Sequence, residues 1–224
     1  LLALWAFPDR STAPVQAARK KVPLGQAFRA VLAEKVLFRV MLADFVIVFA
    51  QGLRGTLFVF FVSFVAGKPE WASALFLLQG AFGIAAGPIW MRIALRLGKH
   101  RTTVLAELVQ VAINLSLLFV TPSGLPLLLA LTVAQGLAQG SGNLMLRAMV
   151  ADVADADRLE TGVDRTALFF SIFSLTSKAA MAVAAGIALP LVGWLGFQPQ
   201  GTNSPQALSA LLIVFALGPA LGHA

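Results

Sequence analysis

The chain has 224 residues, of which 58% are hydrophobic and only 12% are charged, with a formal net charge of +7 at pH 7. A soluble domain is ordinarily about 45–50% apolar and about 25% charged, so this composition excludes an ordinary soluble protein and predicts an all-α, polytopic membrane protein. The sequence contains no cysteine, which excludes disulfides, and neither His100 nor His223 has neighbours at a spacing that predicts a metal site.

The first part of the chain predicts a helix end followed by a cytoplasmic segment. Residues 1–7 are apolar and end at Pro8, and we expect them to be the end of a membrane helix. Residues 8–39 are rich in Lys and Arg and are expected to form a loop. Within that loop, residues 24–36 have apolar side chains at helical spacing, which predicts an amphipathic helix on the inner membrane surface.

Six mostly apolar stretches then follow, each close to the ~20 residues that a helix needs to cross a bilayer. We expect residues 40–224 to form a bundle of six membrane helices, separated by turns that are rich in Gly, Pro and polar residues. The predicted helices cover approximately 40–65, 71–91, 103–121, 125–150, 166–191 and 206–222.

The positions of the basic residues predict the orientation. Lys and Arg gather in the segments 8–39, 92–102 and 151–165, whereas the loops between them hold only Lys68. Because cytoplasmic loops of membrane proteins carry an excess of basic residues, these three segments are predicted to be cytoplasmic loops. The net positive charge therefore predicts a lipid bilayer as partner and does not require a nucleic acid.

Lys178 is the most informative polar residue within the predicted spans. It lies about 12 residues, or roughly 18 Å, into its helix, close to the middle of a ~30 Å hydrocarbon core. Ser171 and Ser174 precede it at helical spacing and share its face. Because a charge at this depth is costly, Lys178 is expected either to face a polar substrate in a cavity or to pair with a neighbouring helix.

Two further spans carry polar side chains. Arg54 lies among small residues, and it is expected to contact substrate or to pair with a carboxylate elsewhere in the protein. The fourth span has a ridge of polar residues four apart, which predicts either a pathway-facing stripe or hydrogen bonds between helices. That ridge consists of Gln135, Gln139, Asn143 and Arg147, accompanied by Gly136 and Gly140.

The acidic residues near the cytoplasmic segments have a different interpretation. Asp44 and Glu107 lie only a few residues from basic clusters, and we interpret them as pairing residues at the membrane interface. Asp152 and Asp155 are three residues apart in the segment 151–165. They predict a cytoplasmic gate, whose ion pairs form in one conformation and break in another, or a solvated loop with weak surface pairs. The basic partners expected for this gate are Arg96, Lys99 and Arg101.

Several motifs resemble one family of transporters. The run Ala151-Asp152-Val153-Ala154-Asp155, followed by Glu160-Thr161-Gly162, Arg165 and a span with Lys178, resembles the melibiose-permease-like glycoside–pentoside–hexuronide:cation symporters of the major facilitator superfamily. Leu53-Arg54-Gly55, Pro88-x-Trp90 and Arg96-x-Gly98-Lys99-x-Arg101 are also similar to that family.

The resemblance implies a twelve-helix fold made of two six-helix halves. Residues 1–7 would be the end of helix six, and the rest of the chain would be the middle loop and the carboxy-terminal half. It also implies a bacterial inner-membrane protein that performs H⁺- or Na⁺-coupled symport of a glycoside, sugar or hexuronide by alternating access. The amino-terminal half would be a partner and would hold the coupling-cation site, and no cofactor is implied.

Together, the residues and the resemblance predict a substrate cavity in the membrane. Its expected lining is Lys178, Ser174, Ser171, Asn143, Gln139 and Arg54. A lipid or amphiphile carrier of the same fold is the alternative, and a membrane sensor or scaffold without transport is a further one. An enzyme is not predicted, because the sequence offers no nucleophile–base pair, metal cluster or phosphate-binding loop.

Overall fold

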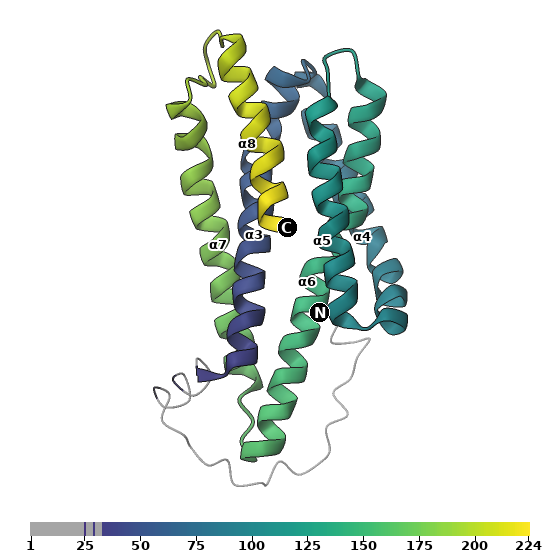
Figure 1. Ribbon diagram of the computed structural model, residues 1–224, viewed down its shortest axis with the longest axis vertical. Helices are drawn as coiled ribbons and strands as arrows, with labels where there is room; N and C mark the ends of the chain where they lie inside the picture. The colour runs from purple at the N-terminus through teal and green to yellow at the C-terminus, as the bar shows by residue number, and fades with distance from the viewer. Residues whose placement is uncertain (1–24, 26–28, 30–32) are drawn as a thin grey trace, which may run out of the picture.

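The computed structural model describes residues 25, 29 and 33–224, and within them it contains helices and no strand. The predictions for residues 1–7, and for the loop and amphipathic helix before residue 33, fall outside this range apart from residues 25 and 29. The helices that the structure describes are shown in Figure 1: α3 (Lys35–Phe60), α4 (Ala72–Leu97), α5 (Lys99–Ser116), α6 (Leu125–Thr161), α7 (Thr166–Trp194) and α8 (Pro205–His223).

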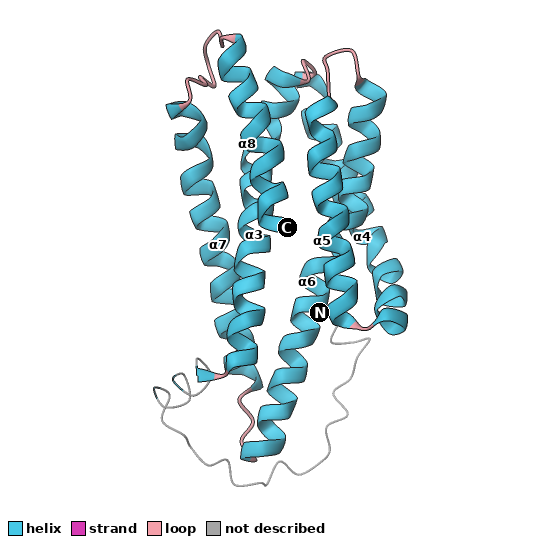
Figure 2. Ribbon diagram, viewed as in Figure 1, coloured by secondary structure: helices cyan, strands magenta, loops and turns pink. Residues whose placement is uncertain are grey.

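Short irregular helices extend three of these elements. A π-helical turn (Phe61–Val65) continues α3, a 3₁₀ turn (Pro69–Trp71) precedes α4, and another 3₁₀ turn (Leu117–Phe119) continues α5. Consecutive long helices run in opposite directions, so that the connections 66–71, 120–124 and 195–204 all lie at the same end of the bundle (Figure 2).

The helices agree with the predicted all-α membrane class. Five helical stretches among the described residues are long and apolar enough to cross a bilayer, namely Lys35–Val65, Pro69–Leu97, Lys99–Phe119, Thr166–Trp194 and Pro205–His223. The helix α6 is not among them, because it carries several amide side chains and glycines in its membrane part. The structure therefore confirms an all-α chain with several membrane helices.

Two of the predicted cytoplasmic loops are largely helical, and this part of the prediction was wrong. Only Gly98, at a φ of +82°, separates α4 from α5, so the segment 92–102 is a tight turn between two helices. Most of the segment 151–165 belongs to α6, which ends at Thr161 and is capped by Gly162 at a φ of +66°. The apolar pattern stops near residue 150, but α6 has 37 residues and is about 55 Å long, so its last turns extend beyond a ~30 Å hydrocarbon core.

The start of α3 also differs from the prediction. The side chain of Glu34 accepts a hydrogen bond from the backbone N–H of Val36 at 3.1 Å and caps the helix there. Residues 35–39, which were assigned to the cytoplasmic loop, therefore form the first turn of α3.

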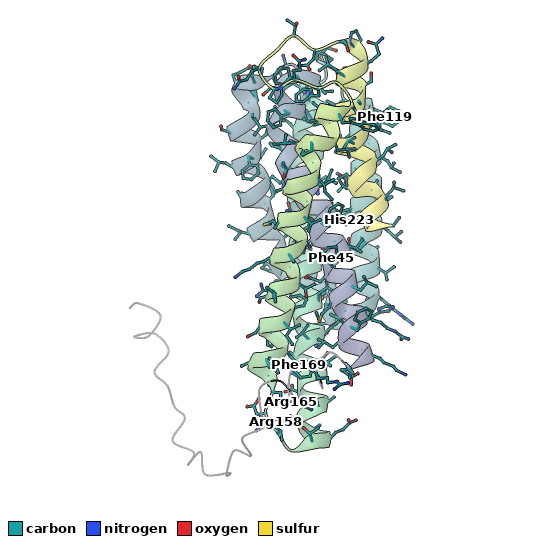
Figure 3. All side chains as sticks on the ribbon, turned by 90° about the vertical axis from the view of Figure 1, so that its left-hand side faces the viewer. Phe45, Phe119, Arg158, Arg165, Phe169 and His223 are labelled. Atoms are coloured by element: carbon teal, nitrogen blue, oxygen red, sulfur yellow. The ribbon has the colours of Figure 1, made fainter. Side chains whose placement is uncertain are left out.

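The helix α3 packs against both α7 and α8, and it contributes to the two larger of the three apolar clusters in the described part of the bundle. Near the end with the three connections, Phe61 of the π-helical turn stacks on Phe215 of α8 with ring centroids 4.1 Å apart. Toward the opposite end, Leu37 of α3, Val150 of α6 and Phe173 of α7 are fully buried against one another. Figure 3 shows the opposite end from a second side, with Arg158 and Arg165 at its limit.

Glycines bring α4 and α6 into close contact. A Cβ atom built on Gly136 would lie 2.4 Å from the carbonyl oxygen of Gln79, and one on Gly140 would lie 2.8 Å from that of Gly83. The indole N–H of Trp90 donates to the carbonyl oxygen of Leu137 at 2.6 Å and ties the same two helices. This close packing of α4 and α6, termed the glycine seam below, sets which side chains of the two helices can meet.

The glycine seam predicts a stability change. Replacing Gly136 with Ala would force the α4 backbone away from α6, and overpacking of this kind typically costs about 1–3 kcal/mol. We expect a lower melting temperature for Gly136→Ala in purified, detergent-solubilised protein. The matched control is Gly80→Ala in α4, where an added Cβ meets no atom within 4 Å, and equal melting temperatures for the two variants would contradict the close packing.

Candidate functional site

Arg54 is a buried cation in the membrane part of α3. The residue is 6% exposed, and its Nη2 donates to the side-chain oxygen of Gln79 on α4 at 2.5 Å. Its guanidinium also lies 5.8 Å from the ring centroid of Phe215. Among the described residues no carboxylate pairs with it, so an amide and an aromatic face stabilise this charge in place of a salt bridge.

The hydrogen bonds of Arg54 continue to a third helix. The side-chain nitrogen of Gln79 donates to the side-chain oxygen of Gln139 on α6 at 2.6 Å. Arg54, Gln79 and Gln139 thus form a chain of hydrogen bonds across α3, α4 and α6, which is called the amide chain below. Arg54 and Gln139 were predicted from the sequence but Gln79 was not, although an isolated amide in an otherwise apolar stretch of α4 was a signal that could have identified it.

A second pair of amides lies behind the first. Gln135 of α6 donates from its side-chain nitrogen to the side-chain oxygen of Gln110 on α5 at 2.6 Å, and Asn114 donates to the backbone oxygen of Gln110 at 2.8 Å. The side-chain oxygen of Gln135 is buried without a hydrogen-bond partner among the described residues. Buried amide oxygens normally have a hydrogen-bond partner, so this one is an exception within the bundle.

A pocket of about 370 Å³ lies between α3, α4 and α6 and is termed the amide pocket. Arg54 and the amide side chains of Gln79, Gln135 and Gln139 are part of its wall. The size lies within the ~300–1,000 Å³ range of small-molecule sites. Its wall combines charged and amide groups with two aromatic rings, Phe58 and Phe76, whose centroids are 5.7 Å apart. The lining residues with polar side chains are Gln51, Arg54, Thr56, Gln79, Gln135 and Gln139.

The predicted cavity residues on α7 do not line this pocket. Lys178 is exposed, and it makes no hydrogen bond or ion pair with any residue that the structure describes. Ser171 is also exposed and donates to the backbone oxygen of Ala167 at 2.7 Å, while Ser174 is half-buried. Met181, three residues beyond Lys178 and on the same face, does line the amide pocket, so Lys178 lies about one helical turn from it.

Asn143 belongs to α6, but its side chain is outside what the structure describes. Its predicted role in the cavity therefore stays a prediction. The serine that contacts a neighbouring helix is Ser177, whose hydroxyl donates to Asp44 Oδ2 of α3 at 2.5 Å.

Asp44 and Glu107 were interpreted as pairing residues, and each contacts a side chain of another helix, while their predicted position at the membrane interface stays a prediction. Asp44 is 0% exposed and is held between α3 and α7 by Ser177, with Arg147 near enough to act on it electrostatically. Glu107 pairs with His223 of α8, with Oε2 and Nδ1 2.5 Å apart. Both partners lie more than 100 residues away in the sequence, so the basic residues nearby in the chain could not identify them.

The gate residues are brought together only in part. Lys99 Nζ donates to both carboxylate oxygens of Asp152, at 2.7 and 2.6 Å, and to the backbone oxygen of Ala148 at 3.2 Å. This contact joins the first turn of α5 to the extension of α6. The remaining three residues, Asp155, Arg96 and Arg101, are exposed and unpaired among the described residues.

A second ion pair at the same end was missed. Arg165, just before α7, forms a two-pronged contact with Asp157 of α6, in which Nε donates to Oδ2 at 2.9 Å and Nη2 donates to Oδ1. The side chains of Arg165 and Asp157 are only 14% and 17% exposed, whereas those of Lys99 and Asp152 are 40% and 61% exposed. The more enclosed pair therefore fixes the turn from α6 into α7.

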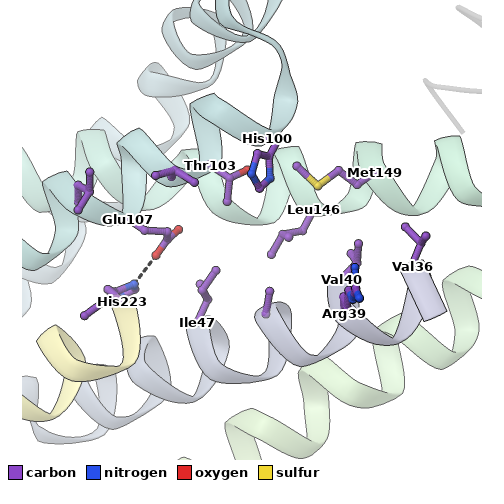
Figure 4. Close-up of a pocket in the computed structure, with 14 residues that line it drawn as sticks. Val36, Arg39, Val40, Ile47, His100, Thr103, Glu107, Leu146, Met149 and His223 are labelled. Atoms are coloured by element: carbon purple, nitrogen blue, oxygen red, sulfur yellow. Dashed lines mark hydrogen bonds and ion pairs between the residues drawn. The ribbon is translucent and has the colours of Figure 1, made fainter.

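A second pocket, of about 480 Å³, lies between α3 and α5 and is mostly apolar (Figure 4). The Glu107–His223 pair lies at one of its ends, and Val36 and Arg39 lie at the other. No group of three or more His, Cys, Asp or Glu side chains that could hold a metal ion occurs in the part of the chain that the structure describes.

Comparison with known proteins gives consistent matches. The sequence model of the family described as MFS/sugar transport protein matches residues 2–224. A protein of Escherichia coli (strain K12) named glucuronide carrier protein homolog is 25% identical over 162 residues, which are 72% of this chain and 35% of that protein. An uncharacterized symporter of Bacillus subtilis (strain 168) is 22% identical over 212 residues, which are 93% of this chain and 45% of that protein.

A third relative is an uncharacterized symporter of Synechocystis sp. (strain ATCC 27184 / PCC 6803 / Kazusa). It is 28% identical over 176 residues, which are 76% of this chain and 32% of that protein. The matches thus cover most of this chain but less than half the length of each of these relatives.

The two ion pairs predict different effects of charge removal. Exposed pairs contribute about 0–1 kcal/mol, so Asp152→Asn is expected to leave the melting temperature nearly unchanged. Asp157→Asn removes a carboxylate that is enclosed with Arg165, and breaking enclosed pairs costs more. Thermal denaturation of both variants in detergent measures the difference, and a larger loss for Asp152→Asn would contradict the assignment of the structural role to Asp157.

Proposed function

This chain belongs to the MFS/sugar transport protein family, a family of membrane transporters and not of enzymes, and we propose that it forms the carboxy-terminal half of a cation-coupled sugar symporter. The coupling cation is H⁺ or Na⁺, and the substrate is a glycoside, sugar or hexuronide. The other wall of the substrate cavity comes from an amino-terminal half, and the protein resides in a bacterial inner membrane. Alternating access then moves the two halves around a site near the middle of the bilayer.

The observation that carries this proposal is the amide chain on the wall of the amide pocket. Sugar hydroxyls both donate and accept hydrogen bonds, and the side chains of Gln79, Gln135 and Gln139 can do the same. The rings of Phe58 and Phe76 offer apolar surface to the C–H faces of a sugar ring. Polar side chains that line a cavity within the membrane are typical of the pathway of a polar solute.

The positive charge of Arg54 favours an acidic sugar as one of the substrates. Its charge has no carboxylate partner among the described residues, and a guanidinium binds a carboxylate in two-pronged geometry. One relative bears the name of a glucuronide carrier homolog, and a glucuronide contains a carboxylate. The hexuronides are therefore the substrates for which Arg54 matters most.

Lys178 and the gate pairs have proposed roles in the same cycle. A lysine exposed at mid-depth of α7 is costly against lipid, so we place Lys178 facing the cavity between the two halves, one turn from the amide pocket. The Lys99–Asp152 pair belongs to the cytoplasmic gate and ties α5 to α6 in the closed conformation of that end.

A lipid or amphiphile carrier remains the alternative, because the pocket between α3 and α5 has a mostly apolar wall. The two substrates would use different pockets. An amphiphile carrier would use the apolar pocket and would not depend on the amide chain.

The proposed function predicts a substrate-selective loss. In the full-length protein reconstituted in liposomes under a proton or sodium gradient, Arg54→Gln should lower uptake of labelled hexuronides by about 10–100-fold, as expected for the loss of a hydrogen bond to a charged group. Uptake of neutral glycosides should fall much less. The control is Gln198→Leu, an exposed amide in the connection before α8.

Lys178→Ala extends the same experiment. Its gradient-driven accumulation of sugar should collapse if Lys178 faces the cavity. Robust uptake by this variant would return Lys178 to a structural role. A folded, inserted wild type that accumulates no sugar but moves lysolipids would contradict the sugar assignment and establish the amphiphile carrier.

A further inference from the structure

A smaller pocket adjoins the amide pocket between α4 and α6 and is termed the side pocket below. Its volume is about 300 Å³, and it shares the lining residues Phe76, Gln79 and Gln139 with the amide pocket. The rest of its wall consists of Ile84 and three glycines of α4 and α6. The two pockets are therefore continuous and can hold two parts of one molecule.

The hydrogen bond between Gln79 and Gln139 lies where the two pockets meet. Both residues line both pockets, with the donor nitrogen and acceptor oxygen 2.6 Å apart. Arg54 lines the amide pocket but not the side pocket. A hexuronide whose carboxylate is bound by Arg54 fills the amide pocket with its sugar ring, and a group attached to that ring can extend past the two glutamines into the side pocket.

The side pocket has a mostly apolar wall. Phe76 is 54% exposed and Ile84 is 84% exposed, so both offer uncovered apolar surface. Gly80 adds open space, because a Cβ atom built on it would meet no atom within 4 Å. Among the described residues that line this pocket, only Gln79 and Gln139 have polar side chains, and these bond to each other. A second sugar ring would find few partners there for its hydroxyls, whereas an apolar ring needs none.

The unpartnered polar atoms lie with the amide pocket instead. Gln135 lines the amide pocket and is 1% exposed, and its side-chain oxygen has no hydrogen-bond partner among the described residues. No buried, unpartnered side-chain atom that the structure describes belongs to a residue of the side pocket. The polar part of a ligand thus matches the amide pocket, and an apolar part matches the side pocket.

The size of the side pocket fits one substituted ring. An apolar cavity of about 150 Å³ is enough to bind benzene, and the side pocket of about 300 Å³ is larger. The ring of Phe76 in its wall can pack against a second aromatic ring in an offset or edge-to-face arrangement. An aromatic group of one ring is therefore the occupant that matches both the volume and the wall.

We propose that the side pocket binds the aglycone of a glycoside, meaning an apolar, ring-sized group attached to the sugar that occupies the amide pocket. This inference rests on the proposed function and deepens it, because it assigns glycosides with an apolar aglycone as the substrate class. Gly80 is the specificity-determining position, since the side chain that it lacks leaves the room for the aglycone.

Binding of two matched ligands to the full-length protein in lipid nanodiscs tests the proposal by calorimetry. The ligands are 4-nitrophenyl glucuronide and glucuronate, which differ by the aryl group. The wild type should bind the aryl glycoside more tightly. Gly80→Leu fills the side pocket, so it should raise the Kd of the aryl glycoside by about tenfold or more and change that of glucuronate by less than about twofold, as expected for an apolar contact that only one ligand makes.

Two further variants control for indirect effects. Gly186 lies inside α7, lines neither pocket, and an added Cβ there also meets no atom within 4 Å. Gly186→Leu should therefore bind both ligands like the wild type, and both leucine variants keep their helices because Leu favours a helix more than Gly does. Ile84→Ala removes exposed apolar surface from the side pocket and should weaken binding of the aryl glycoside alone.

The same comparison with 4-nitrophenyl glucoside and glucose covers a protein that prefers neutral sugars. Equal affinity of the wild type for the two ligands of the pair that it binds would overturn the side pocket as an aglycone site. Equal weakening of both ligands by Gly80→Leu would overturn it too, and either result leaves the proposed function standing. A folded wild type that binds neither pair would contradict the proposed function itself, together with the inference that rests on it.

Discussion

The constraint on which the whole arrangement depends is that a polar group inside a bilayer must find its partner within the protein. Arg54 meets it by donating to Gln79, which in turn donates to Gln139. This chain requires α4 to approach α6 closely, since Gln79 and Gln139 lie on different helices. The glycine seam provides that approach, because Gly136 and Gly140 leave room for the α4 backbone. The close packing of α4 against α6 is therefore what allows these polar side chains to reach their hydrogen-bond partners.

Two of the sets of polar groups in the helices line different pockets and have different chemistry. The amide chain and Gln135 line a pocket with aromatic rings and suit a neutral or acidic sugar. The Glu107–His223 pair lies at the end of a separate, mostly apolar pocket. The helix α5 joins the two sets, since it carries Gln110, which bonds to Gln135, as well as Glu107, which bonds to His223. The helix α5 therefore links the contact between α5 and α8 to the wall of the amide pocket.

The sequence predicted the class of fold well, because hydropathy, turn residues and the distribution of Lys and Arg act locally along the chain. It selected Arg54 and Gln139 because both are polar within apolar stretches. It missed Gln79, Gln110 and Ser177, whose importance lies in contacts between helices that are far apart in sequence. The helix α6 was predicted too short for a related reason, since hydropathy marks the edge of the membrane and not the end of a helix.

The central claim is that substrate binds in the amide pocket, and a cysteine-protection experiment tests it most directly. Thr56 lines the amide pocket and Thr103 lines the pocket between α3 and α5, and each hydroxyl bonds only to the carbonyl four residues earlier in its helix. In a full-length protein without other cysteines, the rate of maleimide labelling of Thr56→Cys should fall when the transported sugar saturates the protein, while that of Thr103→Cys should not change. Protection of Thr103→Cys alone would place the substrate in the other pocket and contradict the account.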